Sequence, residues 1–344
     1  MKNIIKKISN HYVTFFFVFT IGAFIILPMW FTQEFQINDD TQRIEINVEK
    51  PSLDLGVKYK EINLLHNSDN IVETLELDDY LVNVVAAEMP VDYELEALKA
   101  QATVARTYTL YQIENSHKHT NADICDNSAC CQAWVSKEKR FESWGENQEE
   151  KWEKLQTAVY STAGEIITYQ GKPIDAFFHS NSGGTTEIPI NVWGGSNFPY
   201  LQVVETSGED EYSQYYSEVE YTKEELTEKM KQNYEDFLIN WEEANCIEIL
   251  EYTESSRIKT IKIGNKNISG IEARKIFSLK SSNFTYEILD NKIKFKVIGY
   301  GHGVGLSQTG SNTLAKQGEN YQEIIKHFFK DIEIEKVEEN RKLI

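Results

Sequence analysis

The hydrophobic pattern first separates a short amino-terminal region from the rest of the chain. Residues 12–31 read YVTFFFVFTIGAFIILPMWF and contain 20 positions without a charge. As a helix this run would rise about 1.5 Å per residue and cross the roughly 30 Å hydrocarbon layer of a bilayer. Because Lys2, Lys6 and Lys7 precede it, the positive-inside rule predicts a cytoplasmic tail over residues 1–11 and an extracytoplasmic remainder.

A cleaved signal peptide is the alternative interpretation of this run. Its apolar part would be shorter and would end in a small-x-small site. Here the run ends in Leu-Pro-Met-Trp-Phe, which favours a retained single-pass anchor. The polar, unpatterned residues 32–60 that follow are typical of a stalk.

From residue 61 to about residue 335, helical and strand periodicities alternate, which predicts an α+β fold. We therefore expect an N-terminal transmembrane helix followed by one mixed helix/sheet extracytoplasmic domain over residues 61–335. A charged, variable-looking segment lies at about 205–255. The pattern predicts helices over about 78–88, 95–112, 149–164, 221–241 and 311–317, a hairpin of strands 165–169 and 174–179, a strand at 292–299, and a segment 257–277 that begins as a strand and turns at Gly270 into a short helix.

The net charge limits the partners of this domain. The chain carries a formal net charge of −19 at pH 7, and its first 31 residues contribute three lysines and no acid. Nucleic-acid binding needs lysine and arginine to displace counterions, so we expect no nucleic-acid partner. The aromatic share of 12% would allow sugar-stacking surfaces, although tyrosine and phenylalanine also fill ordinary cores.

A glutamate at the end of the first predicted helix is the candidate acid. Pro90 disfavours helical geometry at the residue before it, so the helix is expected to end near Glu88. Leu81, Val84 and Val85 share the face of Glu88, which is therefore apolar. Partial desolvation and the negative end of the helix dipole both raise the pKa of a carboxyl there, as a general acid near neutral pH requires. A surface glutamate at a frayed helix end is the alternative.

The second predicted helix, LEALKAQATVARTYTLYQ, is rich in alanine and can approach a neighbour closely. Gln101, Ala105 and Tyr108 share one face of it, whereas Arg106 points elsewhere. An arginine on a mostly buried helix requires a carboxylate partner. Arg106 is therefore either a structural ion-pair residue or a substrate-positioning residue.

Three of the four cysteines cluster with a histidine in the stretch HTNADICDNSACC, residues 119–131. His119, Cys125 and Cys131 follow one another at intervals of six residues, and Cys130 adjoins the last. Thiolate and imidazole are good tetrahedral zinc ligands, and a site with three protein ligands leaves a fourth position for water or substrate. A Cys125–Cys131 disulfide in an oxidising exterior is the alternative.

Six motifs occur in a fixed order: VVAAEMP, LKAQATVARTY, a His-x5-Cys-x5-Cys-Gln run that ends at Gln132, FFHSNSGGTTE, ISGIEARKIF and GYGHGVGLSQTGSNTLAKQG. Together with the single N-terminal anchor, they closely resemble the stage II sporulation protein D family of sporulation lytic transglycosylases, over roughly residues 71–330. Two departures from the family pattern stand out. Ser-Gln-Thr-Gly-Ser-Asn occupies 307–312, where relatives commonly have an aromatic residue and then Gly-Ala, and Cys130 is an extra thiol.

The resemblance implies cleavage of peptidoglycan glycan strands between N-acetylmuramic acid and N-acetylglucosamine, best on strands stripped of stem peptides. It implies that Glu88 is the catalytic acid, and that His119, Cys125 and Cys131 bind one zinc ion, as in clostridial-type members. The implied process is engulfment of the forespore, with the catalytic domain on the mother-cell membrane facing the forespore. The implied partners are the stage II sporulation proteins P, an amidase and endopeptidase, and M, a membrane protein.

One carboxyl suffices for this reaction, because a lytic transglycosylase adds no water. Glu88 would protonate the glycosidic oxygen and then take the proton of the muramic acid 6-hydroxyl, whose oxygen closes on C1 and leaves a 1,6-anhydro end. Arg106, Ser180, His302 and Gln308 are the candidates for substrate binding in the cleft. Structural hydrogen bonding is the alternative for each of them.

Two other functions stay open on the sequence. The same domain is found in amidase enhancers, so a non-catalytic glycan-binding module would fit the motifs, although a retained Ala-Ala-Glu-Met-Pro favours the enzyme. A zinc-dependent cell-wall hydrolase would use the metal to activate water and would leave reducing ends. Two thiolates make zinc a weaker Lewis acid than three imidazoles would, which ranks the hydrolase last.

Overall fold

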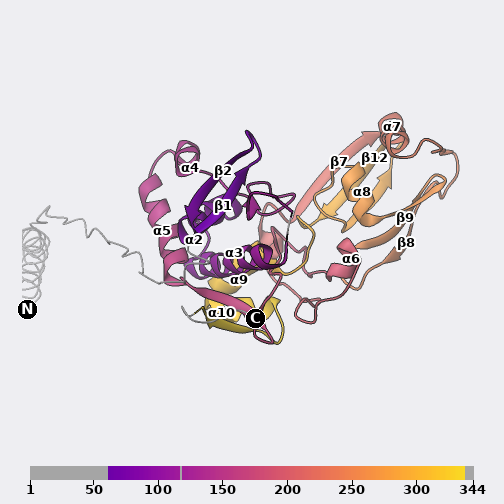
Figure 1. Ribbon diagram of the computed structural model, residues 1–344. Coiled ribbons are helices and arrows are strands. Elements are labelled where there is room, and N and C mark those ends of the chain that lie inside the picture. Colours follow the sequence, from indigo (N-terminus) through magenta and orange to yellow (C-terminus); the bar gives the residue numbers. More distant parts are fainter. Residues whose placement is uncertain (1–60, 117, 338–344) are drawn as a thin grey trace, which may run out of the picture. The chain divides into compact units, whose positions relative to one another are not determined.

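The structure, a computed structural model, describes residues 61–116 and 118–337, all of which belong to one compact unit (Figure 1). Helices and strands occur in mixed order around two separate hydrophobic cores, which confirms the α+β class. In the described part of the chain, no helix has the length and hydrophobicity needed to cross a bilayer. The predicted tail, anchor and stalk, residues 1–60, lie outside the described residues.

The first core forms around helix α3 (Leu95–Asn115), which is buried along most of its length. Its many alanines let neighbouring elements approach closely, since a methyl side chain takes little space between two backbones. Helix α2 (Leu77–Glu88) presents an apolar face to this core, with Leu81 and Val85 fully buried. The other helices that contact α3 are α5 (Gln148–Ser161), α9 (Gln308–Lys316) and α10 (Tyr321–Phe328).

Short sheets flank the first core. One has the order β2-β1-β3, with β1 (Glu61–His66) antiparallel to β2 (Ile71–Glu76) and parallel to β3 (Ile124–Cys125). The others are β14-β4-β5 and the parallel pair β6-β13, formed by β14 (Glu333–Lys336), β4 (Glu165–Tyr169), β5 (Lys172–Pro173), β6 (Phe178–His179) and β13 (Leu306–Ser307). The short helices are α4 (Lys137–Trp144), α6 (Pro189–Trp193) and the 3₁₀ turn η1 (Glu209–Glu211).

The second core contains side chains from two antiparallel sheets and two helices. The sheets have the orders β11-β12-β7 and β10-β9-β8, and in β12 apolar residues alternate with lysines, so one face is buried. The elements are β7 (Tyr216–Thr222), α7 (Lys223–Asn233), β8 (Ile247–Tyr252), β9 (Ile258–Ile263), β10 (Lys266–Ser269), α8 (Gly270–Ile276), β11 (Phe284–Ile288) and β12 (Lys292–Ile298).

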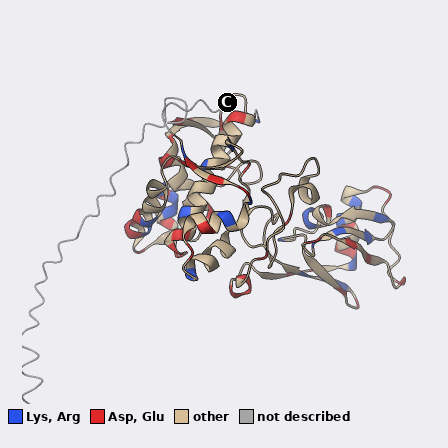
Figure 2. Ribbon diagram, turned by 90° about the horizontal axis from the view of Figure 1, so that it is seen from below, with Lys and Arg blue, Asp and Glu red and all other residues tan. Residues whose placement is uncertain are grey.

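The charged segment predicted at 205–255 contributes β7 to this sheet. Lys294 on β12 lies 3.0 Å from Glu218 and 2.9 Å from Glu220 on β7, so the outer face carries cross-strand ion pairs. Figure 2 shows both signs of charge on this strand-rich part of the molecule. The charges on β7 therefore belong to the solvated face of a sheet.

Two of the predicted elements differ from the structure. The hairpin closes after β5, and residues 178–179 leave it to pair with β13. The reason is that residues 178–179 pair with β13 in the glycine-rich loop. This partner is distant in the sequence, and the local alternation of apolar and polar residues does not reveal it. The helix predicted over 221–241 is only α7, because its N-cap, Thr222, is the last residue of strand β7 and Tyr234 ends it. The remaining predicted helices and the strands near 258 and 292 are present within a few residues.

Candidate functional site

Glu88 is the last residue of α2, as predicted, and its side chain is partly buried at the wall of a cavity. Burial raises the pKa of the Glu88 carboxyl, opposed by a hydrogen bond from the Ala133 N–H and another from Gln308. The carboxyl thus keeps its proton to a higher pH than an exposed glutamate does.

The two oxygens of Glu88 have different surroundings. Oε1 accepts the Ala133 N–H at 2.6 Å, whereas Oε2 lies 3.5 Å from the Gln308 amide, a long and weak contact. Ala133 is held in place because its neighbour Gln132 is buried and donates to Tyr80 and Thr109. Oε1 is therefore an acceptor of fixed position, and Oε2 is the oxygen left to carry the proton.

Glu88 lines two adjoining cavities. The larger has a volume of about 720 Å³ and the smaller about 280 Å³, and Glu88, Ser180 and Gln308 line both. The larger cavity also contains His302 and Cys131 in its lining. Among the predicted substrate-binding residues, the structure thus brings Ser180, His302 and Gln308 together with Glu88.

Two histidines in the larger cavity offer opposite hydrogen-bonding groups. His302 Nδ1 accepts the Val304 N–H at 3.0 Å, which places the hydrogen of the neutral ring on Nε2. His179 Nδ1 lies 3.1 Å from the Val304 carbonyl, so His179 Nε2 is a bare acceptor, and it has no partner in the described part of the chain. Burial lowers the pKa of both rings, so both are neutral near pH 7. Sequence reasoning named His302 and missed His179.

Arg106 does not line either cavity, so the structure does not place this predicted substrate-binding residue at the site. Its guanidinium is fully buried and pairs with Asp78 at 2.9 Å. It also donates to the carbonyls of Thr162 and Val159, at 2.8 and 3.0 Å. The cause is burial, because a guanidinium inside a core needs a carboxylate and carbonyl acceptors around it. Arg106 thereby connects α2, α3 and α5.

A buried carboxylate that the sequence did not single out, Glu209, lies behind the cavity without lining it. Glu209 accepts hydrogen bonds from the Ser182, Thr206, Ser307 and Thr309 hydroxyls. Burial raises the pKa of Glu209, but these hydrogen bonds outweigh it and hold the pKa below its ordinary value. Glu209 therefore fastens the segment after β6 to the segment after β13. Glu209 lies in the charged segment, where no local signal distinguishes it.

The glycines of the loop serve packing within the protein. A side chain at Gly303 would meet the Arg257 guanidinium at 2.4 Å, and one at Gly301 would meet His179 at 2.8 Å. Both glycines have positive φ angles, 84° and 115°, which other residues rarely adopt. Their conformation allows the loop to lie directly against β6 and Arg257.

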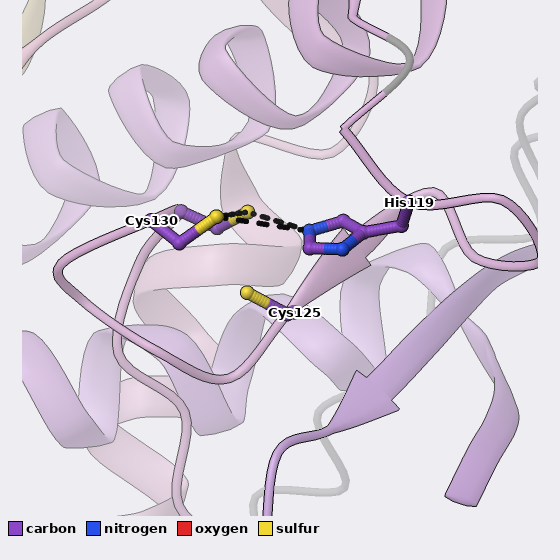
Figure 3. A group of neighbouring side chains, drawn as sticks. His119, Cys125 and Cys130 are labelled. Carbon is purple, nitrogen blue, oxygen red and sulfur yellow. Dashed lines mark hydrogen bonds between the residues drawn. The ribbon is translucent and has the colours of Figure 1, made fainter. Parts of the chain in front are cut away.

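His119, Cys125 and Cys131 lie together, as predicted, and Cys130 lies with them. Figure 3 shows the labelled side chains of His119, Cys125 and Cys130 converging from separate positions of the loop and β3. All four cysteines of the chain have free thiols. One imidazole and a set of thiols at such close range is the donor set that zinc prefers, so these residues fit the ion that the family resemblance implies.

Comparisons with known proteins identify the family of the chain. The family described as Stage II sporulation protein matches residues 66–169. The chain is 30% identical over 275 residues to stage II sporulation protein D of Bacillus amyloliquefaciens, covering 79% of this chain and 78% of that protein. It is 28% identical over 323 residues to stage II sporulation protein D of Bacillus subtilis (strain 168), covering 92% of each.

A likeness to a second kind of protein is also present. The chain is 28% identical over 301 residues to an amidase enhancer of Bacillus subtilis (strain 168), covering 72% of this chain and 39% of that protein. The family match and the two relatives named stage II sporulation protein D define the class of this chain as a stage II sporulation protein. The chain belongs to the stage II sporulation protein D family.

Proposed function

We propose that this protein is a peptidoglycan lytic transglycosylase that cleaves glycan strands between N-acetylmuramic acid and N-acetylglucosamine. The observation that carries the proposal is the solitary carboxyl of Glu88, whose pKa is raised by burial. Among the described residues, no other carboxyl lines either cavity. Most glycoside hydrolases need two carboxyls about 5–10 Å apart, so a cavity with one favours a reaction in which the substrate supplies its own nucleophile.

In the proposed reaction Glu88 acts first as an acid and then as a base. Oε2 gives its proton to the glycosidic oxygen, and the bond from that oxygen to C1 of muramic acid breaks. The resulting carboxylate takes the proton of the muramic acid 6-hydroxyl, whose oxygen bonds to C1 and forms the 1,6-anhydro ring. The proton on Glu88 is thereby restored, and no water is consumed.

The charges of the cavities support denuded glycan as the substrate. Lys118 and Arg274 line the larger cavity and Arg140 lines the smaller one, although the chain as a whole has a net charge of −19. Muramic acid stripped of its stem peptide exposes the carboxylate of its lactyl group. Cations in the cavity lining attract such an anion, whereas a peptide-bearing strand presents an amide there.

The proposal includes one zinc ion held by His119, Cys125 and Cys131. Bound zinc would crosslink the loop after α3 to β3 and would take no part in bond cleavage. Cys131 lines the larger cavity, and two residues later Ala133 donates its N–H to Glu88. The cluster would therefore hold the segment that positions the acid.

The family relationship places the protein in sporulation, and we propose that it acts in engulfment of the forespore. It would be a single-pass protein of the mother-cell membrane, with its N-terminus in the cytoplasm and its catalytic domain outside. The proposed partners are the stage II sporulation proteins P and M.

Mass analysis of the products formed from denuded glycan tests the proposed reaction. The wild-type chain should release fragments with 1,6-anhydromuramic acid ends. Glu88→Gln should lower this release by at least about 10²-fold, as expected for loss of a general acid, and should still bind the glycan. Glu153→Gln, on the exposed side of α5, is the matched control and should leave release unchanged.

The likeness to an amidase enhancer favours a second candidate function, a non-catalytic glycan-binding module. The same experiment separates the two. Binding without any fragments from the wild-type chain would support the binding module and reject the transglycosylase. Fragments with reducing ends would instead indicate a hydrolase.

A further inference from the structure

Cys130 lies among the three proposed zinc ligands and has no role in a three-ligand site. The ligand atoms of His119, Cys125, Cys130 and Cys131 all lie within 4.8 Å of one another. Cys130 Sγ lies 3.8 Å from Cys131 Sγ and 3.8 Å from His119 Nε2. Cys131 Sγ lies 3.5 Å from the same nitrogen.

These separations are close to the edges of a zinc tetrahedron. With Zn–S bonds of about 2.3 Å and Zn–N bonds of about 2.0–2.1 Å, tetrahedral angles put two sulfurs about 3.8 Å apart and sulfur and nitrogen about 3.5 Å apart. Cys130 meets the first value with Cys131 and exceeds the second by a few tenths of an ångström with His119. All four ligand atoms could therefore bind one ion after small movements.

The backbone explains how two adjacent cysteines can face the same point. In a strand, successive side chains point to opposite faces, but residues 128–130 form a turn and residue 131 is a bend. The N–H groups of Cys130 and Cys131 both donate to the Asn127 carbonyl, at 3.0 and 2.8 Å. The Asn127 N–H in turn hydrogen-bonds the Cys125 sulfur. Asn127 therefore arranges all three thiols around one position.

We infer that Cys130 is the fourth zinc ligand and completes a closed site of three cysteines and one histidine. This inference rests on the zinc part of the proposed function, in which only three protein ligands were assigned. A closed site leaves no position for water or sugar, as in structural zinc sites. Cys130 and Cys131 both line the larger cavity, so the ion would fix the cavity wall without contacting the glycan.

X-ray absorption of the zinc-loaded, full-length chain in detergent tests the assignment without any substitution. We expect a first shell of three sulfurs and one nitrogen. Cobalt(II) in place of zinc gives a second readout, since each thiolate adds to the sulfur-to-cobalt charge-transfer band. Cys130→Ala should lower that band by about one third and should weaken zinc binding by more than the roughly 10–100-fold that loss of an outer-shell group costs. The matched control is Cys246→Ala, because Cys246 lies in the second core, and it should change neither.

A wild-type first shell of two sulfurs and two lighter atoms would overturn the inference, as would an unchanged cobalt spectrum in Cys130→Ala. A wild-type chain that binds no zinc and carries a disulfide among these cysteines would overturn both this inference and the zinc part of the proposed function. Neither result bears on the release of anhydro-ended fragments, which tests Glu88 separately.

Discussion

The two ends of helix α2 carry carboxylates with opposite surroundings. At the first turn, Asp78 pairs with the fully buried guanidinium of Arg106 at 2.9 Å. At the last residue, Glu88 has a backbone N–H and a long contact with an amide, and among the described residues it makes no ion pair. The same helix therefore holds one acid that fastens the core and one whose environment favours its protonated form.

This difference shows what separates a structural carboxylate from a reactive one. A buried carboxylate beside a buried cation contributes to stability mainly because its removal would leave the cation unpaired. A carboxylate that is buried without a cation loses solvation instead, which raises its pKa and suits it to proton transfer. Substitutions at the two ends of α2 should therefore affect different measurements.

The largest expected effect on stability is at the paired end. Arg106→Met should lower the free energy of unfolding by about 3–5 kcal/mol, because Asp78 and the Thr162 carbonyl would remain buried without their partner. Denaturant titration measures this change. Arg274→Met, in a half-buried arginine at the cavity, should cost much less. An equal loss of stability in both variants would contradict the distinction between the ion-paired Arg106 in the core and Arg274 at the cavity.

At the other end of α2, the stability of the wild type and that of Glu88→Gln should depend differently on pH. Between the ordinary pKa of about 4.5 and the raised pKa of Glu88, the folded state keeps a proton that the unfolded state has lost. The wild-type free energy of unfolding should therefore fall with rising pH, relative to Glu88→Gln, by about 1.4 kcal/mol per pH unit across that window. Below that pH window, the free energies of unfolding of the two proteins should change with pH in the same way.

Thermal unfolding of both proteins over a pH series measures this difference. The rate of anhydro-product release by the wild type should decline as pH rises through the same raised pKa, because the acid form of Glu88 disappears. A stability difference that does not depend on pH would contradict the account of Glu88, even if Glu88→Gln were inactive.

The smallest expected effect concerns Gln308. Its amide favours the charged form of Glu88 and so lowers the pKa of Glu88. Gln308→Ala should therefore shift the decline in activity to higher pH, by less than about one unit because the 3.5 Å contact is long. The measurement is the pH profile of product release, with Gln214→Ala as a control that lines the smaller cavity without contacting Glu88. A shift of the decline to lower pH would contradict the claim that the Gln308 amide lowers the pKa of Glu88.

Local pattern was sufficient for some parts of the site and insufficient for others. The position of Glu88 at a helix end on an apolar face follows from the spacing of Leu81, Val84 and Val85 and from Pro90, all within seven residues of it. The burial of Arg106 on an alanine-rich helix likewise predicted a carboxylate partner. It could not show that the partner would be Asp78, because that choice depends on how α2 and α3 pack.

The groups that support Glu88 come from distant parts of the chain. Ala133 and Gln308 reach it across 45 and 220 residues, and no periodicity links such positions. Glu209 resembles its acidic neighbours in the sequence until its burial among hydroxyl groups is known. His179 became a candidate only because its Nε2 is buried without a partner at the cavity.

The sequence by itself determined the α+β class, the acid at the end of a helix and the grouping of His119, Cys125 and Cys131, because each depends on neighbours a few residues apart. Tertiary structure alone decided that Arg106 belongs to the core, that Ser180, His302 and Gln308 meet Glu88 at one cavity, and that Cys130 turns toward the other thiols. Those outcomes depend on which surfaces are buried against each other and which polar groups are left to find partners. Both are properties of the packed chain, and neither is a property of any one segment.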